Sequence, residues 1–197
     1  MVGKDKDKEN DEEIKVIFID DLMDIFTIGD GSSPSYFDKI FKKLPENFKY
    51  ELYTINKANN ESGEQKGNFA LFNNNICETE KKFEGCKSFC ELVEKINFKD
   101  AYVYIDYSLN GNQLLIDKDN DSRKVIKIIS EKNDNLPKSL CIYSAIRPGD
   151  AKELAIELNS KINKFNIDYT CFSNSKYFAE EYLEEEFKHL KELTENN

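Results

Sequence analysis

The chain has 197 residues and a formal net charge of −10, with 39% hydrophobic and 34% charged residues. An excess of acidic residues argues against a broad nucleic-acid surface, because phosphate backbones are bound by clustered Lys and Arg. No run of about 18 apolar residues is present, so the sequence predicts no membrane-spanning helix.

Residues 1–13 are polar and charged and lack the apolar centre of a signal peptide, which predicts a disordered lead-in. The five cysteines are odd in number and form no paired CxxC units, which indicates a reducing, cytoplasmic setting. Cys86 and Cys90 are spaced by one helical turn. A metal site there is an alternative to ordinary burial of the two thiols.

The first predicted strand begins at Ile14 and ends on two acids, Asp20 and Asp21. Its nearly continuous apolar run is expected of a strand with both faces covered by helices. Because strand side chains alternate, the two acids start on opposite faces. The following segment has helical character in part of 22–28 and predicts a helix over 36–44.

The second predicted strand covers 50–55 and is followed by a polar segment with one apolar island at 69–72. A loop of this length is uncommon inside a compact domain, so it is either an ordered insertion or a flexible arm. The pattern next predicts a helix over 88–96 and a short apolar strand over 101–106, closed by the turn residues Asn110 and Gly111.

An acidic run, 117–121, follows this strand and resembles the start of a calcium loop. Ser122 and Ile128 stand where such a loop requires Gly and Glu, so a solvated loop and helix start is the alternative. The remaining pattern predicts the helices 125–131, 151–164 and 177–193, the strands 140–145 and 167–172, and a polar tail over 194–197.

Strands that alternate with helices predict a parallel sheet with right-handed crossovers and helices on both faces. We expect a single domain over 14–193, with an insertion at about 56–85. The order of the strands cannot be inferred from the alternation.

Polar residues end three of the predicted strands, namely Asp20 with Asp21, Asp106, and Ser144. Carboxylates gathered at one sheet edge repel one another unless one is protonated or a cation neutralises them. Mg²⁺ prefers such oxygen ligands, and it would allow one carboxylate to attack phosphorus as a nucleophile. Alternatively, these acids cap the following helices or bind water.

Three segments together resemble the receiver domains of two-component response regulators: Val16–Asp21, Val103–Gly111 and Ile142–Ala145. The resemblance implies a flavodoxin-like, three-layer α/β/α fold with a five-stranded parallel sheet in the order 2-1-3-4-5. It also implies phosphorylation by a sensor histidine kinase or phosphotransfer protein, with Mg²⁺ as cofactor.

The family's functional residues map onto six positions of this chain. Asp106 would accept the phosphoryl group, Ser144 would contact it, and Tyr169 would be the switch aromatic. The metal ligands implied by the resemblance are Asp20, Asp21, Asp106 and the backbone carbonyl of Ser108.

The chain departs from the receiver pattern in two places. Phe172 and Ser173 stand where the family has Lys-Pro, which removes a cation expected at the phosphoryl group. The spacing between Asp21 and Asp106 is also longer than usual, and the excess falls in the insertion.

Three functions remain open. The first is a stand-alone receiver that acts through an unidentified protein partner, since no DNA-binding module follows. The second is a degenerate pseudo-receiver used only for protein interaction. The third is a haloacid-dehalogenase-like phosphatase, although that family requires Asp-x-Asp and Asp20 is followed by Asp21 and Leu22.

Overall fold

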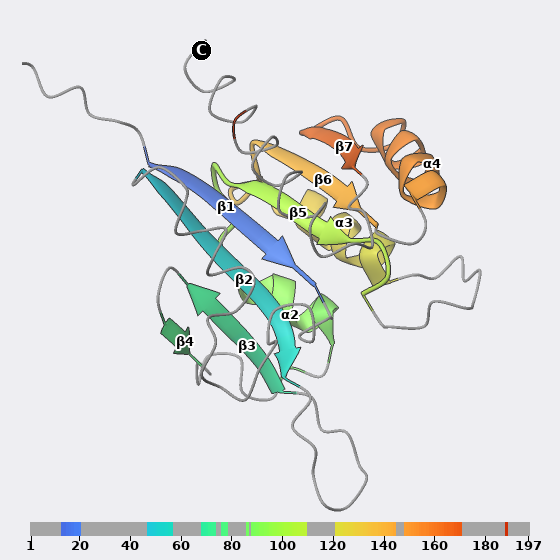
Figure 1. The fold of residues 1–197 in the computed structure, drawn as a ribbon. Helices are drawn as coiled ribbons and strands as arrows, with labels where there is room; N and C mark the ends of the chain where they lie inside the picture. The colour runs from blue at the N-terminus through green and yellow to red at the C-terminus, as the bar shows by residue number, and fades with distance from the viewer. Residues whose placement is uncertain are drawn as a thin grey trace, which may run out of the picture.

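The computed structural model describes residues 13–20, 47–56, 68–73, 76–78, 86, 88–109, 121–144, 148–170 and 188. A single seven-stranded sheet has the order β4-β3-β2-β1-β5-β6-β7 (Figure 1). The strands are β1 (Ile14–Ile19), β2 (Phe48–Asn56), β3 (Asn68–Asn73), β4 (Ile76–Glu78), β5 (Tyr102–Asp106), β6 (Ser139–Tyr143) and β7 (Asn166–Thr170). The described helices are α2 (Phe89–Lys95), α3 (Asp121–Glu131) and α4 (Pro148–Asn159).

The central part of the sheet is parallel. β1 pairs in parallel with β2 and with β5, β5 pairs with β6, and β6 pairs with β7. Counted along the parallel strands alone, the order is 2-1-3-4-5, so the predicted flavodoxin-like α/β arrangement is confirmed. In sheets of this type, ligands bind beyond the carboxyl ends of the strands, where the connections on the two sides diverge.

The insertion between the second and third parallel strands contributes two further strands. The apolar island at 69–72 lies in β3, which pairs antiparallel with β2, and β4 pairs antiparallel with β3. Leu71 of β3 stands opposite Tyr53 of β2, and both side chains are buried. This part of the insertion is therefore an ordered extension of the sheet edge, and β2 separates it from β1.

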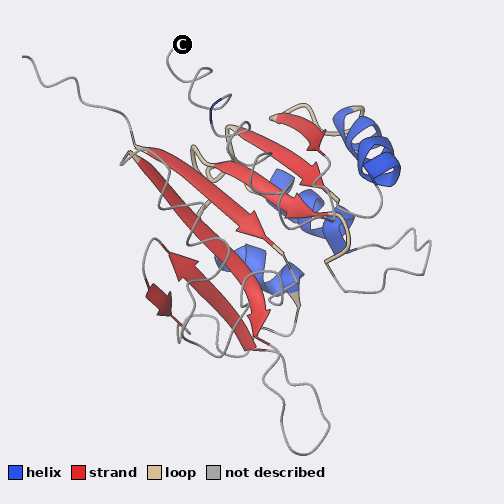
Figure 2. Ribbon diagram, viewed as in Figure 1, coloured by secondary structure: helices blue, strands red, loops and turns tan. Residues whose placement is uncertain are grey.

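The described helices pack on one side of the sheet, which we call the helical face (Figure 2). Alternation along β1 and β5 sends Ile17, Ile19, Val103 and Ile105 to this face, where all four are almost fully buried. Helix α2 begins at Ser88, whose hydroxyl accepts a hydrogen bond from the backbone N–H of Glu91 (3.2 Å). None of the described helices has the length and apolar character needed to cross a membrane.

Helix α4 differs from its prediction at both ends. It begins at Pro148, a favoured first-turn residue, and ends at Asn159 instead of 164. Its end is set by the Asn159 side chain, which accepts from the backbone N–H of Ile167 (3.0 Å) and donates to the carbonyl of Ile167. Leu154 and Leu158 face the core, whereas Ile156 is 59% exposed because a residue two positions away lies on the other side of a helix.

The opposite side of the sheet, which we call the aromatic face, carries Phe18, Tyr104 and Tyr143. The rings of Phe18 and Tyr104 are stacked, with centroids 5.0 Å apart and an interplanar angle of 18°. All three side chains are buried, at 1%, 2% and 7% exposure. The predicted helix 36–44 lies outside the described residues, as do the predicted helix 177–193 apart from position 188 and most of the acidic run 117–121.

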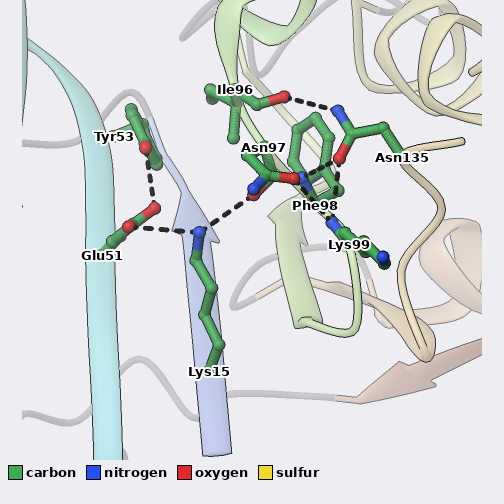
Figure 3. A network of polar contacts seen from close by, with 8 residues as sticks. All are labelled: Lys15, Glu51, Tyr53, Ile96, Asn97, Phe98, Lys99 and Asn135. Atoms are coloured by element: carbon green, nitrogen blue, oxygen red, sulfur yellow. Dashed lines mark hydrogen bonds and ion pairs between the residues drawn. The ribbon is translucent and has the colours of Figure 1, made fainter.

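A polar network holds the amino-terminal side of the sheet together (Figure 3). The Asn135 side chain accepts from the backbone N–H groups of Phe98 (2.5 Å) and Lys99 (2.9 Å) and donates to the carbonyl of Ile96 (2.8 Å). It therefore ties the loop after α3 to the connection between α2 and β5.

A second part of this network links β1 with β2. Lys15 donates to the carbonyl of Asn97 (3.0 Å) and forms an ion pair with Glu51 (3.2 Å), and Glu51 accepts from the Tyr53 hydroxyl (2.7 Å) (Figure 3). Both parts of the network connect backbone segments that are distant in sequence, so we interpret them as structural.

Candidate functional site

Two buried carboxylates lie at the carboxyl ends of neighbouring strands. Asp106 is the last residue of β5, and Asp20 directly follows β1. Ile19 of β1 pairs with Ile105 of β5, and Asp20 and Asp106 are the next residues along the chain. Neighbouring strands lie about 4.8 Å apart, so the two acids are close together. The exposed fractions are only 3% for Asp20 and 7% for Asp106. The structure thus brings two of the predicted site residues to one small region of the sheet edge.

Tyr143 belongs to this site and was missed by the sequence reasoning. It pairs with Asp106 in the β5–β6 register, so both side chains lie on the aromatic face. Its hydroxyl donates a hydrogen bond to Oδ2 of Asp20 and thus spans the intervening strand β5. The alternation along β6 indicates which face of the sheet Tyr143 lies on, but only the strand order shows that its hydroxyl reaches Asp20.

Among the described residues, two buried aromatic rings lie next to the two acids on the aromatic face. Phe18 and Tyr104 precede Asp20 and Asp106 by two residues, and their stacked rings form the next layer down the aromatic face. A buried carboxylate is disfavoured in its charged form by desolvation, and a second carboxylate nearby adds repulsion. The site therefore favours a bound cation, a shared proton or strong hydrogen-bond donors, and Tyr143 supplies one such donor.

Ser144 is buried at the end of β6, with 3% exposure. Its backbone N–H donates to the carbonyl of Thr170 on β7 (3.4 Å), which continues the ladder between these strands. Ser144 lies one residue beyond β6, so strand alternation does not fix the direction of its side chain. Ser144, the predicted phosphoryl contact, thus lies at the same edge of the sheet as Asp106, next to Tyr143.

The turn after β5 is fixed by a second residue that the sequence reasoning missed. Ser122 is fully buried near the start of α3, and its hydroxyl lies 2.6 Å from the carbonyl oxygen of Asp106 and 2.8 Å from that of Tyr107. The Tyr107 N–H also donates to the carbonyl of Tyr143 (2.8 Å). Ser108, the predicted carbonyl ligand, is partly buried within this turn. The backbone around Asp106 is therefore held from both α3 and β6.

Tyr169 lies apart from the acids, on the edge strand β7. Its side chain is 39% exposed, and the ammonium group of Lys152 lies 5.6 Å from the centre of its ring. Two residues, Ile167 and Tyr169, share the helical side of this strand. Asp21 and the positions of the missing Lys-Pro pair, 172 and 173, lie outside the described residues.

The donor set suits Mg²⁺ better than a softer metal. Mg²⁺ is held in proteins by one or two carboxylates and keeps several waters, and Asp20 and Asp106 provide two such groups. Among the described residues, no group of three or more His, Cys, Asp or Glu side chains is arranged to hold a metal ion. Cys86 is buried and Cys90 is partly buried, and neither forms a disulfide.

No model of a protein family matches the sequence, and no curated protein sequence matches it. Among solved structures, the chain is similar to the D319A mutant of the PilB minor pilin from Streptococcus sanguinis, with a TM-score of 0.50 and 9% sequence identity. The match covers 92% of this chain and 62% of the pilin chain, which is less than two thirds of that protein. At this identity the likeness concerns the fold alone.

Proposed function

We propose that the chain is a receiver-like signalling domain that accepts a phosphoryl group on Asp106. The observation that carries this proposal is the placement of Asp106: a carboxylate at the carboxyl end of the central parallel strand, beside the buried carboxylate of Asp20. A strand end in a parallel α/β sheet is where chemistry is usually located. A sensor histidine kinase or phosphotransfer protein would be the donor, and a protein partner would receive the signal.

The reaction is the transfer of a phosphoryl group from a phosphohistidine, or from acetyl phosphate, to a carboxylate. An oxygen of Asp106 attacks phosphorus and forms the P–O bond of an acyl phosphate. The P–N bond of phosphohistidine, or the P–O bond of acetyl phosphate, breaks, and the electron pair leaves with the imidazole or acetate. Ser122 contributes by holding the Asp106 backbone in place through its carbonyl.

Asp20, Asp106 and the carbonyl of Ser108 would hold the Mg²⁺ ion, together with Asp21 as the sequence suggests. When bound, the ion screens the negative charge of the carboxylates and of the incoming phosphoryl group. The Ser144 hydroxyl would donate a hydrogen bond to a phosphoryl oxygen, and Tyr169 on β7 would be the switch aromatic.

The test is incubation with acetyl phosphate and Mg²⁺, followed by intact mass measurement. We expect one phosphoryl adduct on the wild-type chain and none on Asp106→Asn. Asp134→Asn, which changes an exposed carboxylate after α3, is the matched control and should be modified like the wild type. An adduct that persists in Asp106→Asn would contradict the proposal, as would a wild type that stays unmodified by acetyl phosphate and by beryllofluoride.

A second function, a pseudo-receiver that binds protein without accepting phosphate, is favoured by one contact. The Tyr143 hydroxyl donates to Oδ2 of Asp20, a carboxylate that the first function assigns to the metal. A phenol in this position stabilises the charged carboxylate without any ion. In this case, the wild type would bind no Mg²⁺ and would remain unmodified, and Asp106→Asn would retain the chain's protein contacts.

A further inference from the structure

We propose that Tyr143 gates the cation site by holding Asp20 in the ion-free protein and releasing it when Mg²⁺ binds. This inference rests on the proposed function, because it concerns the same two carboxylates. It assigns a positioning role to a residue that the receiver resemblance leaves unassigned.

The first observation is the bond itself. Tyr143 is 7% exposed and Asp20 is 3% exposed, so the hydrogen bond between hydroxyl and Oδ2 forms away from bulk water. Bonds from a hydroxyl to a charged carboxylate are among the stronger hydrogen bonds of proteins. A cation at Asp20 draws on the same negative charge and would have to compete with this donor.

The second observation is the position of Tyr143 over the neighbouring acid. Tyr143 is in register with Asp106, and Asp20 lies one strand beyond it, so the phenol spans the region between the two carboxylates. Asp20 and Asp106 are the carboxylates that would hold the ion, and the phenol spans the region between them. Ion binding and the Tyr143–Asp20 bond are therefore alternatives at the same place.

The third observation connects Tyr143 to the rest of the site. Its carbonyl accepts from the N–H of Tyr107, in the turn that also contains Ser108, and the next residue in the chain is Ser144. A displacement of Tyr143 would thus be transmitted directly to the turn after β5 and to the end of β6. Through these contacts, Mg²⁺ binding would shift the backbone on both sides of the site.

The test is titration of the purified chain with Mg²⁺ alone, measured by calorimetry. Tyr143→Phe removes the hydroxyl and keeps the ring, and we expect it to bind Mg²⁺ about tenfold more tightly or better, in line with the loss of one hydrogen bond to a charged group. Tyr53→Phe is the matched control, because it removes a hydroxyl bonded to Glu51 on the helical face, and it should bind like the wild type. Tyr143→Leu, which also removes the ring, should bind at least as tightly as Tyr143→Phe and serves if Tyr143→Phe does not fold.

A second readout is specific to the phenol. Addition of Mg²⁺ to the wild type should change the near-ultraviolet tyrosine absorbance, and the change should be absent in Tyr143→Phe and retained in Tyr53→Phe. Equal or weaker Mg²⁺ binding by Tyr143→Phe and Tyr143→Leu overturns the gate, and so does an absence of binding in every variant.

The phosphorylation assay separates this failure from failure of the proposed function. Tighter Mg²⁺ binding by Tyr143→Phe without any adduct on Asp106 would uphold the gate and contradict the receiver function. Adduct formation on wild type and Tyr143→Phe with identical Mg²⁺ affinity would uphold the receiver function and contradict the gate.

Discussion

The hydroxyl of Tyr143 donates a hydrogen bond to Oδ2 of Asp20, although the two residues are 123 positions apart in the sequence. The bond joins the ends of β1 and β6 across β5, the strand that ends at Asp106. It places a phenol, two buried carboxylates and a stacked aromatic pair in one region of the sheet edge.

Replacing Asp106 with Asn should stabilise the ion-free protein. Asp20 and Asp106 are buried on neighbouring strands, and removal of one charge relieves both repulsion and desolvation. We expect a gain of about 1 kcal/mol, or a rise in the unfolding midpoint of roughly 2–4 °C in the presence of a chelator. Thermal unfolding monitored by circular dichroism gives the answer, with exposed Asp134→Asn as the reference. A lower midpoint would mean that Asp106 makes net favourable interactions as a charged group.

Replacing Ser122 with Ala should destabilise the fold by about 1–3 kcal/mol, because buried carbonyl groups lose their donor. The hydroxyl of Ser122 lies within hydrogen-bond distance of the carbonyls of Asp106 and Tyr107. Urea unfolding at neutral pH measures the loss. The matched control is Ser130→Ala in the same helix, where the hydroxyl donates to the carbonyl of Lys127 (2.7 Å) one turn earlier. We expect Ser130→Ala to cost less than half as much, and equal losses would argue against a special role for Ser122.

Replacing Asn135 with Ala should cost about 2–4 kcal/mol, since three hydrogen bonds to the backbone are lost together. The groups left behind are the N–H groups of Phe98 and Lys99 and the carbonyl of Ile96. The comparison is Asn133→Ala, an exposed residue whose side-chain oxygen accepts from Lys164 (2.7 Å). Denaturant titration of both variants should separate them clearly, and similar midpoints would contradict the structural role given to Asn135.

The ion pairs of Glu157 should make stability sensitive to acid. Hydrogen bonds from Arg123 and Lys161 lower the pKa of Glu157 from 4.5 to about 2. Because the pKa is depressed in the folded state, the stabilisation is present above pH 4.5 and is lost as the pH falls towards 2. Glu157 is on the protein surface, so the effect is small and screened by salt.

The measurement for Glu157 is the urea midpoint at pH 6 and at roughly pH 2.5, compared between the wild type and Glu157→Gln. The variant should unfold earlier than the wild type at the higher pH, and this difference should shrink at the lower pH. Glu153→Gln, on the same helix but outside this ion-pair cluster, is the control. A difference between wild type and Glu157→Gln that does not depend on pH would show that the charge of Glu157 is not responsible.

The strands of the parallel sheet could be predicted from local pattern because each is a short apolar run bounded by polar or turn residues. β1 begins at Ile14 as predicted, and β5 and β6 differ from the predicted spans by one or two residues at their ends. Helix α4 was predicted too long, since apolar Ile162 continued the pattern beyond the Asn159 side chain that pairs with β7. Periodicity does not detect a side chain that ends a helix by bonding to another element.

The insertion shows a different limit. The island at 69–72 is apolar, but a strand of this length is stable only when a partner strand is available. β3 pairs antiparallel with β2, and β4 pairs antiparallel with β3. The two strands therefore add an antiparallel edge to the predicted parallel sheet. Nothing in the local pattern of 56–85 specifies which edge of the sheet it joins.

Alternation and strand ends in the sequence were sufficient to place Asp20 and Asp106 at a sheet edge, because both properties depend on neighbouring residues alone. Their proximity, and the role of Tyr143, required the tertiary structure. The β5–β6 register sets Tyr143 beside Asp106, and the strand order sets Asp20 one strand further, within reach of the phenol. Register and strand order arise from burial and hydrogen bonding between segments that are far apart in the chain. The hydrogen bond from the Tyr143 hydroxyl to Asp20 therefore became evident only from the assembled sheet.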